Sequence, residues 1–221
     1  MPSHAGPNLI TDGLVVHLDA KDRNSYTSGD TWYDLSGKNN HCVFDVTPTH
    51  NGTHFTFDGA TTWGDILNNA TLDFANEQTI IMVLRHTYTS GRTNPWNQAY
   101  GGYGTWTHEH GNAINYFFGD AGVDNVPYTN ILSAGTSTSV WNVLGITRNT
   151  TTARWFLNGA MSGEITHYYG PLAATAANIS IGYGYAGFWP GDMALVMAYT
   201  RQLSIAEVNT HYEQYKTRFG L

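Results

Sequence analysis

The stretch that decides the fold is residues 179–221, which read ISIGYGYAGFWPGDMALVMAYTRQLSIAEVNTHYEQYKTRFGL. Ile179 and Ile181 stand on either side of a serine, before a glycine-rich turn, and this alternation predicts a short strand. After the turn, every residue from Met193 to Tyr199 is apolar, as in a strand that is covered on both faces. We therefore expect this second strand at the centre of its sheet or beneath another element.

A helix is expected to close this unit. Ser204 and Glu207 have the spacing of a capping box, in which each residue's side chain binds a backbone N–H that the first helical turn leaves free. Gly220 is placed to end the helix. Spacings of three and four residues predict one buried stripe on the helix, at Ile205, Val208, Tyr212 and Tyr215.

Strands are also expected earlier in the chain. Alternating apolar residues between Leu14 and Leu18 predict a first strand that is buried on one face. The β-branched run from Thr79 to Leu84 predicts a strand that is buried on both faces. Segments 140–147 and 153–157 predict a hairpin, and the Asn158-Gly159 dipeptide after it favours a tight turn.

Two sets of residues resemble the laminin-G-like jelly rolls of the concanavalin A-like lectin/glucanase group, in the subgroup that is common in phage structural proteins. The closing set comprises 191–199, Leu203, 204–207, Tyr212, Lys216 and 218–220. The opening set comprises 13–15, 18–20, 25–26, 31–37 and 57–59. The resemblance implies an all-β fold, a two-sheet antiparallel jelly-roll sandwich with one C-terminal α-helix. We expect residues 1–11 to form an extended N-terminal arm and residues 12–221 to form a single domain.

The composition excludes several classes of function. The chain has 221 residues, of which 12% are charged, and its formal net charge is −7. Without a cluster of lysines and arginines, it lacks the basic surface that nucleic-acid binding needs. Its start lacks the features of a signal peptide, and no apolar run reaches the length of about 18 residues that a membrane span needs. We therefore expect neither a nucleic-acid nor a membrane partner, and synthesis in a host cytoplasm.

The resemblance also bears on function. Some enzymes of this superfamily hydrolyse β-glucans with a Glu-x-Asp-x-Glu strand, and the sequence contains no such strand, so we expect no enzymatic activity. The first prediction is a structural virion protein of a phage, a capsid decoration or a head/tail-associated protein, located in the virion. Its partners would be other virion proteins or copies of itself. The alternative is a carbohydrate-binding lectin-like module, free or displayed on the virion, with glycans as its partners.

Exposed aromatic residues are the candidates for carbohydrate binding, because sugar rings stack on aromatic planes while Asn and Asp side chains bind hydroxyl groups. Packing in the sandwich core is the alternative for the same rings. The candidate residues are Trp96, Tyr100, Tyr103, Trp106, Tyr185 and Trp189.

Calcium is the one cofactor that the sequence suggests. The resemblance implies it, since related laminin-G, pentraxin and lectin folds hold a calcium ion at the rim with Asp carboxylates, Asn side chains and backbone carbonyls. Asp120, Asp124 and Asn125 lie within six residues of one another in a glycine-rich segment. Hydrogen bonding within Asx turns, which needs no ion, is the alternative.

An apolar excess in the closing strand predicts a covered surface. Ala194, Leu195 and Met197 occupy positions where the resembled family usually has polar or charged residues that face water. Tight packing of the C-terminal helix would cover them, and so would contact with another subunit. We expect the subunit contact, with residues 1–8 as a second attachment.

Overall fold

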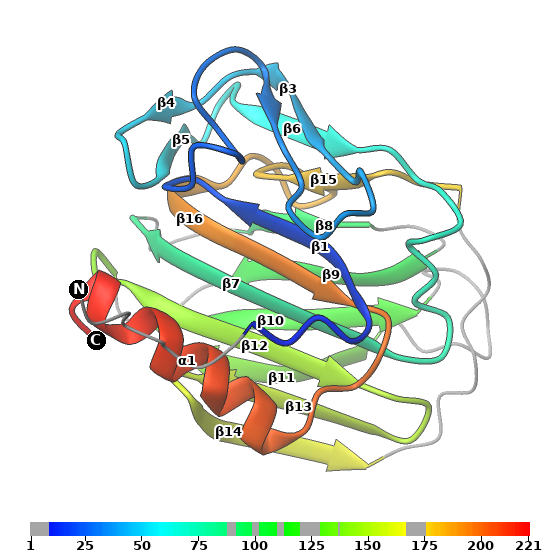
Figure 1. Cartoon of the computed structure of the whole chain (residues 1–221). Helices are drawn as coiled ribbons and strands as arrows, with labels where there is room; N and C mark the ends of the chain where they lie inside the picture. The colour runs from blue at the N-terminus through cyan, green and yellow to red at the C-terminus, as the bar shows by residue number, and fades with distance from the viewer. Residues whose placement is uncertain are drawn as a thin grey trace, which may run out of the picture.

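The chain folds as a sandwich of two antiparallel sheets with one helix against the outer face of the first sheet (Figure 1). The computed structural model describes residues 9–87, 92–98, 102–109, 113–119, 129–136, 138–166 and 176–221, with the backbone alone at 102–109, 113, 117–119 and 129–135. This architecture confirms the predicted jelly-roll sandwich with its C-terminal helix.

The first sheet, called sheet A, lies on the helix side. In spatial order it contains β14 (Ala160–Thr166), β13 (Thr152–Leu157), β12 (Asn142–Arg148), β7 (Gln78–His86), β16 (Pro190–Tyr199), β5 (Phe55–Asp58) and β4 (Thr49–His50), and β1 (Leu14–Asp19) pairs with β16.

The second sheet, called sheet B, lies behind sheet A in the view of Figure 1. In spatial order it contains β11 (Thr129–Gly135), β10 (Ala113–Gly119), β9 (Gly102–Glu109), β8 (Thr93–Asn97), β15 (Ile179–Ile181), β6 (Trp63–Ile66), β3 (Cys42–Val46) and β2 (Thr31–Trp32).

Strand β16 occupies the centre of sheet A, as its unbroken apolar run predicts. It pairs with β7 along one edge, and along the other edge with β5 over its first half and β1 over its second half.

The prediction for β1 is wrong in one respect, since Leu14 to Leu18 are buried at every position. Because β1 lies between the core and the helix side of the sandwich, both of its faces are covered.

The predicted hairpin is formed by β12 and β13, which pair from Leu144 with Leu157 to Arg148 with Ala153. Asn158 and Gly159 then turn the chain into β14, with φ angles of 50° and 80°. Positive φ at both central residues is typical of the type I′ turn that suits a twisted hairpin, and Asn-Gly is its preferred sequence. The sequence therefore predicts this turn through a known backbone requirement.

The core between the sheets is rich in aromatic rings. Burial of such large side chains supplies most of the free energy that favours folding of a sandwich of this size. The largest fully buried rings of this core are Trp32, Phe55, Phe57, Phe74, Trp96, Tyr116, Trp155 and Trp189.

Helix α1 (Ile205–Phe219) begins and ends as predicted. The Ser204 hydroxyl accepts from the Glu207 N–H, the Glu207 carboxylate accepts from the Ser204 N–H, and Gly220 closes the helix with a φ of 70°. Arg201 donates to the same carboxylate, and this bond lowers the pKa of Glu207 to about 2. At 15 residues, this helix is too short to span a membrane, and no other helix occurs among the described residues.

The buried stripe of α1 differs from the prediction. Val208 and Tyr215 are buried as expected, but Ile205 is 47% exposed, while His211 is fully buried. The hydroxyl of Tyr199 lies 2.9 Å from Nε2 of His211. This contact provides a partner for Nε2 that the sequence of the helix alone does not reveal, whereas Nδ1 is buried without a hydrogen-bond partner among the described residues.

The structure corrects the predicted subunit interface. Ala194, Leu195 and Met197 are fully buried within the single chain. They belong to what we call the helix-side cluster, which joins the outer face of sheet A to α1 through Val208 and Tyr215. The alternative explanation, packing of the C-terminal helix, therefore accounts for the apolar excess, and these three residues offer no surface to a second subunit.

The end of the predicted arm packs against the same cluster. Leu9 and Ile10 are partly buried against it, and the Tyr199 hydroxyl donates to the carbonyl oxygen of Ile10 at 3.1 Å. Residues 1–8, expected to be a second attachment point, lie outside the described part of the chain.

Candidate functional site

The outer face of sheet B is hollowed where β3 and β6 run side by side. The hollow has a volume of about 310 Å³. We call it the Trp63 hollow, and its lining consists of Val43, Phe44, Asp45, Trp63, Asp65 and Leu67.

Strand alternation places the strand residues of this lining, apart from the buried Phe44, on one face. Successive residues of a strand point to opposite sides of the sheet, so each strand has one buried and one solvent-facing set. The buried set is Cys42, Phe44, Gly64 and Ile66. The solvent-facing set is Val43, Asp45, Trp63 and Asp65.

A rigid turn directly precedes β6 and fixes where the strand begins. One carboxylate oxygen of Asp58 accepts from the backbone N–H groups of Ala60, Thr61 and Thr62 at 2.8–3.0 Å. Its other oxygen accepts from the Thr61 hydroxyl at 2.6 Å. These bonds, that from the Thr61 hydroxyl foremost, hold the pKa of Asp58 below its usual range. The turn is therefore fixed immediately before Trp63.

Gly64 brings β6 close to β3. A Cβ atom on Gly64 would lie 2.8 Å from Sγ of Cys42 and 2.8 Å from Cδ1 of Phe44. No larger residue fits there without displacing these side chains. The glycine thus lets Trp63 and Asp65, on either side of it, lie on the outer face while the backbone rests directly on the core.

A polar row crosses the sheet beside the hollow. The strand register places Val43 opposite Asp65, Asp65 opposite Ser180, and Ser180 opposite Asn97. The Ser180 hydroxyl donates to Oδ1 of Asp65 at 2.6 Å. That bond orients the carboxylate, whose second oxygen can still accept a hydrogen bond.

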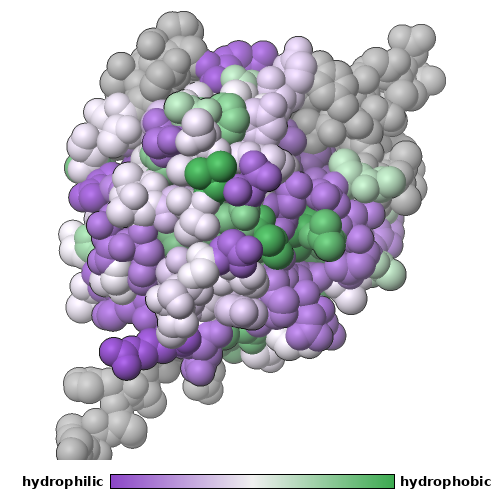
Figure 2. Space-filling view, turned by 90° about the horizontal axis from the view of Figure 1, so that it is seen from above, coloured by the Kyte–Doolittle hydropathy of each residue, from purple (hydrophilic) through white to green (hydrophobic). Residues whose placement is uncertain are grey.

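An aromatic row flanks the hollow on the side of the turn after β15. The ring centroids of Trp63 and Tyr183 lie 5.3 Å apart, and those of Tyr183 and Phe188 lie 4.5 Å apart. Leu67 and Val43 are 66% and 45% exposed. Figure 2, which views the molecule from above, shows hydrophobic residues close together among hydrophilic ones on the side where β3 and β6 lie.

The two kinds of side chain suit one ligand chemistry. A ring such as that of Trp63 stacks on the apolar face of a sugar, while carboxylates such as Asp45 and Asp65 accept hydrogen bonds from hydroxyl groups. Among the described residues, the lining contains no lysine or arginine. The hollow therefore favours a neutral polyhydroxylated ligand over an anionic one.

Two of the predicted carbohydrate-binding residues are wrong. Trp96 and Trp189 are both fully buried. Trp96 stands opposite Ile181 in the sheet B ladder, and both belong to the core. The ring of Trp189 packs 5.8 Å from that of Phe57. Neither indole can stack on a sugar. Both rings pack in the sandwich core, which was the alternative role for them.

The other four aromatic predictions have different outcomes. Tyr185 is 56% exposed, and its place at the surface leaves its predicted role as a prediction. Tyr103 and Trp106 lie on β9, where the structure describes only the backbone, and Trp106 stands opposite Trp96 in the ladder. Tyr100 lies outside the described residues.

The predicted calcium ligands Asp120, Asp124 and Asn125 all lie outside the described residues, so the calcium site stays a prediction. Within the described part of the chain, no three His, Cys, Asp or Glu side chains gather in a way that could hold a metal ion.

Sequence reasoning missed Trp63, the aromatic residue of the hollow. The signal was present in the alternation of Trp63, Gly64, Asp65 and Ile66, directly after the Asp58 turn. Trp63 and Asp65 share one face of the strand, and Gly64 and Ile66 share the other. Each face thus carries one large apolar side chain, and the pattern did not reveal which face was the outer one. That assignment depends on pairing with β3 and β15, which come from distant parts of the sequence.

Comparison with known families gives a match over most of the chain. A family model described as the concanavalin A-like lectin/glucanases superfamily matches residues 58–209. The matched range begins at the Asp58 turn and includes Trp63, all of β16 and the start of α1. None of the curated protein sequences matches this chain.

Solved structures with the same fold share little sequence with the chain. The binding domain of Paraclostridial Mosquitocidal Protein 1 is 14% identical, with a TM-score of 0.72 over 93% of this chain and 53% of that one. The binding domain of botulinum neurotoxin DC in complex with SialylT is 10% identical, with a TM-score of 0.70 over 93% of this chain and 53% of that one. Trypanosoma rangeli sialidase in complex with sialic acid is 13% identical, with a TM-score of 0.70 over 99% of this chain and 35% of that one. The chain thus spans about half the length of the toxin domains.

Proposed function

The chain belongs to the concanavalin A-like lectin/glucanases superfamily, and from this premise we propose that it is a non-catalytic module that binds neutral glycans in the Trp63 hollow. The observation that carries the proposal is the position of Trp63, a partly exposed ring beside two carboxylates on the open face of a lectin-like jelly roll. Stacking and hydroxyl recognition are then available to one sugar ring at the same place.

A binding role also agrees with the state of the carboxylates in the hollow. Glycoside hydrolysis generally needs two carboxyl groups on opposite sides of the scissile bond, one to donate a proton and the other to act as base or nucleophile. Asp65 already accepts the Ser180 hydroxyl, and Asp45 lies on the neighbouring strand of the same face. The proposal assigns both carboxylates to hydroxyl recognition, since Asp65 already accepts a hydrogen bond from one hydroxyl group, that of Ser180.

We propose separately that the module is displayed on a phage particle. The support for this proposal is the resemblance of the opening and closing segments to phage structural proteins. The burial of Ala194, Leu195 and Met197 removes the surface that a purely structural virion role was expected to use. A glycan-binding module displayed on a particle fits both observations, and mass spectrometry of purified particles tests the location.

The proposed function is tested with an array of neutral oligosaccharides and the variant Trp63→Ala. We expect the variant to bind about five- to thirtyfold more weakly than the unaltered chain, because the stacking energy of one aromatic ring is about 1–2 kcal/mol. The matched control is Tyr33→Ala, which removes another exposed ring that does not line the hollow.

Thermal unfolding separates binding from folding in this experiment. Trp63→Ala should keep a melting temperature close to that of Tyr33→Ala. Neutral-glycan binding that survives Trp63→Ala, or that Tyr33→Ala weakens equally, would contradict the assignment to the hollow.

A further inference from the structure

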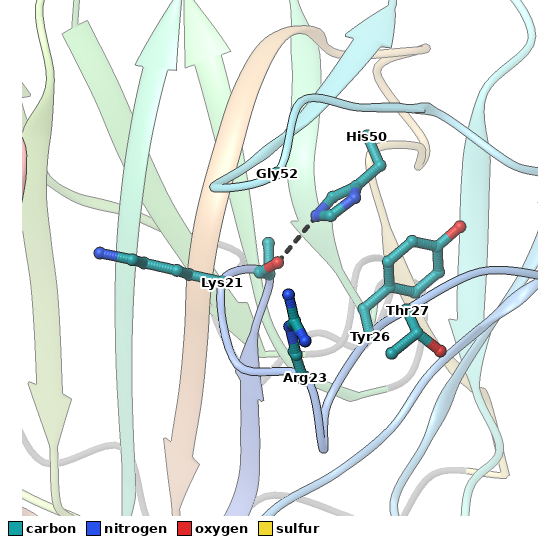
Figure 3. Close-up of a pocket in the computed structure, with 7 residues that line it drawn as sticks. Lys21, Arg23, Tyr26, Thr27, His50 and Gly52 are labelled. Carbon is teal, nitrogen blue, oxygen red and sulfur yellow. Dashed lines mark hydrogen bonds between the residues drawn. The ribbon is translucent and has the colours of Figure 1, made fainter.

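A second hollow lies at the rim of the sandwich, between the loop after β1 and the turn after β4. It has a volume of about 360 Å³. We call it the rim hollow, and residues from 20 to 27 and from 50 to 52 line it (Figure 3). A volume of this order is enough for one monosaccharide or a similar small molecule.

The wall of the rim hollow is held rigidly by His50. Its Nε2 lies 2.8 Å from the carbonyl oxygen of Ala20, so Nε2 carries the proton and donates. Its ring packs edge-on against Tyr26 at 4.7 Å and beside Phe55 at 5.0 Å. The Tyr26 hydroxyl in turn donates to the carbonyl oxygen of Gly29. These contacts join the two loops without using the space between them.

Two cations of this hollow have no partner. Neither Lys21 nor Arg23 makes a side-chain hydrogen bond or an ion pair within the described residues, and both are exposed. By contrast, Arg85, Arg201 and Arg218 each bind a carboxylate. The side chains of Lys21 and Arg23 can therefore both meet an anionic ligand, on a chain whose net charge is −7.

The two acids beside these cations in the sequence bind other groups. Asp19 binds Arg218 at 2.7 Å and also accepts the Lys21 N–H, while Asp22 accepts the Asn24 N–H. The positive charge at the hollow is therefore not cancelled by a carboxylate bound to it. Figure 3 shows the Arg23 side chain directed toward the space beneath His50, while Lys21 extends away from it.

We propose that the rim hollow binds an oxyanion group, the carboxylate or sulfate of an acidic sugar, with Arg23 as its main contact. The planar guanidinium presents paired donors that match two oxygens of such a group, and Lys21 adds a positive potential at the mouth. The Thr27 hydroxyl, exposed in the lining, is available to a neighbouring hydroxyl of the ligand. This site is distinct from the Trp63 hollow in both its residues and its ligand charge.

Because both cations are exposed, the attraction is screened by water and salt. We expect a dissociation constant near the millimolar range that weakens as salt is raised. NMR titration of the full chain with glucuronate, inorganic sulfate and neutral glucose measures this. Binding of glucuronate alone assigns the site to a sugar acid, equal binding of glucuronate and sulfate assigns it to the oxyanion itself, and both outcomes uphold the proposal.

Matched variants locate the site. Arg23→Gln removes the charge at similar size and should weaken oxyanion binding at least about tenfold, whereas Arg23→Lys should restore part of it. Lys38→Gln removes an exposed cation outside this hollow and should change nothing. Failure of both anions to bind at millimolar concentration, equal binding of glucose, or equal loss in Lys38→Gln would overturn the proposal. Trp63→Ala should leave this binding unchanged, so the two sites succeed or fail separately.

Discussion

The outer faces of the two sheets differ in whether a helix covers them, and their side chains differ accordingly. On sheet A, α1 covers the outer face of the strands, and the residues of that face in the helix-side cluster are as apolar as the core. On sheet B, no helix of the described residues covers the outer face at β3 and β6, which mixes Trp63 and Leu67 with Asp45 and Asp65. The same strand alternation therefore produces a second core on one side and a candidate recognition surface on the other.

The same substitution, leucine to alanine, tests the difference between the two faces. Leu195→Ala, beneath α1, should cost about 2–5 kcal/mol in the free energy of unfolding, because it leaves a cavity in a fully buried cluster. Urea unfolding measures this cost. A cost below about 1 kcal/mol would mean that α1 is only loosely attached to sheet A.

The next largest effect is expected from acid, which should lower the stability of the covered face. Burial lowers the pKa of His211 to about 4, with the neighbouring His17 adding to the effect, and burial also lowers the pKa of His17. A histidine that is neutral when folded takes up a proton on unfolding, so stability is complete above pH 6.5 and falls as the pH drops toward 4. For His211 the full loss is about 3 kcal/mol.

Melting temperature against pH measures this loss, with a variant as the control. His211→Gln keeps a polar partner for the Tyr199 hydroxyl but does not titrate, so its stability should fall less between pH 6.5 and 4. An unchanged slope in this variant would assign the acid sensitivity to other groups.

The smallest effect on stability is expected on the open face. Leu67→Ala removes a side chain that is 66% exposed, and it should change the free energy of unfolding by less than about 0.5 kcal/mol. It should nevertheless weaken glycan binding about two- to threefold, since Leu67 lines the Trp63 hollow. Isothermal titration measures the glycan binding of the variant, and urea unfolding measures its stability for comparison with Leu195→Ala. A large loss of stability would show that this face is part of the core.

The elements that the sequence predicted well depend on local rules. The Ser204 capping box, the Gly220 stop and the Asn158-Gly159 turn each satisfy backbone groups or φ angles within a few residues. The central place of β16 was also predictable, because only a strand covered on both faces tolerates apolar residues at every position.

The candidate site was predicted much less well, because it depends on pairing over long distances. Trp63 and Trp96 are the same residue type in strands of the same sheet, and one lines the hollow while the other is fully buried. A shift of one residue in strand register moves a side chain to the opposite face. No local pattern distinguishes these two tryptophans, so the sequence alone could not choose between recognition and packing for them.

The sequence by itself determined the strands, the turn residues, the capped helix and an apolar excess in residues 193–199 that something had to cover. Only the tertiary structure decided that α1 covers Ala194, Leu195 and Met197, that Trp63 faces outward beside Asp65, and that Lys21 and Arg23 remain unpaired at the rim. The reason is that propensity and capping act between neighbours in the chain. Burial, by contrast, depends on which distant segment packs on each face, as with Asp65, whose partners Val43 and Ser180 stand far from it in the sequence.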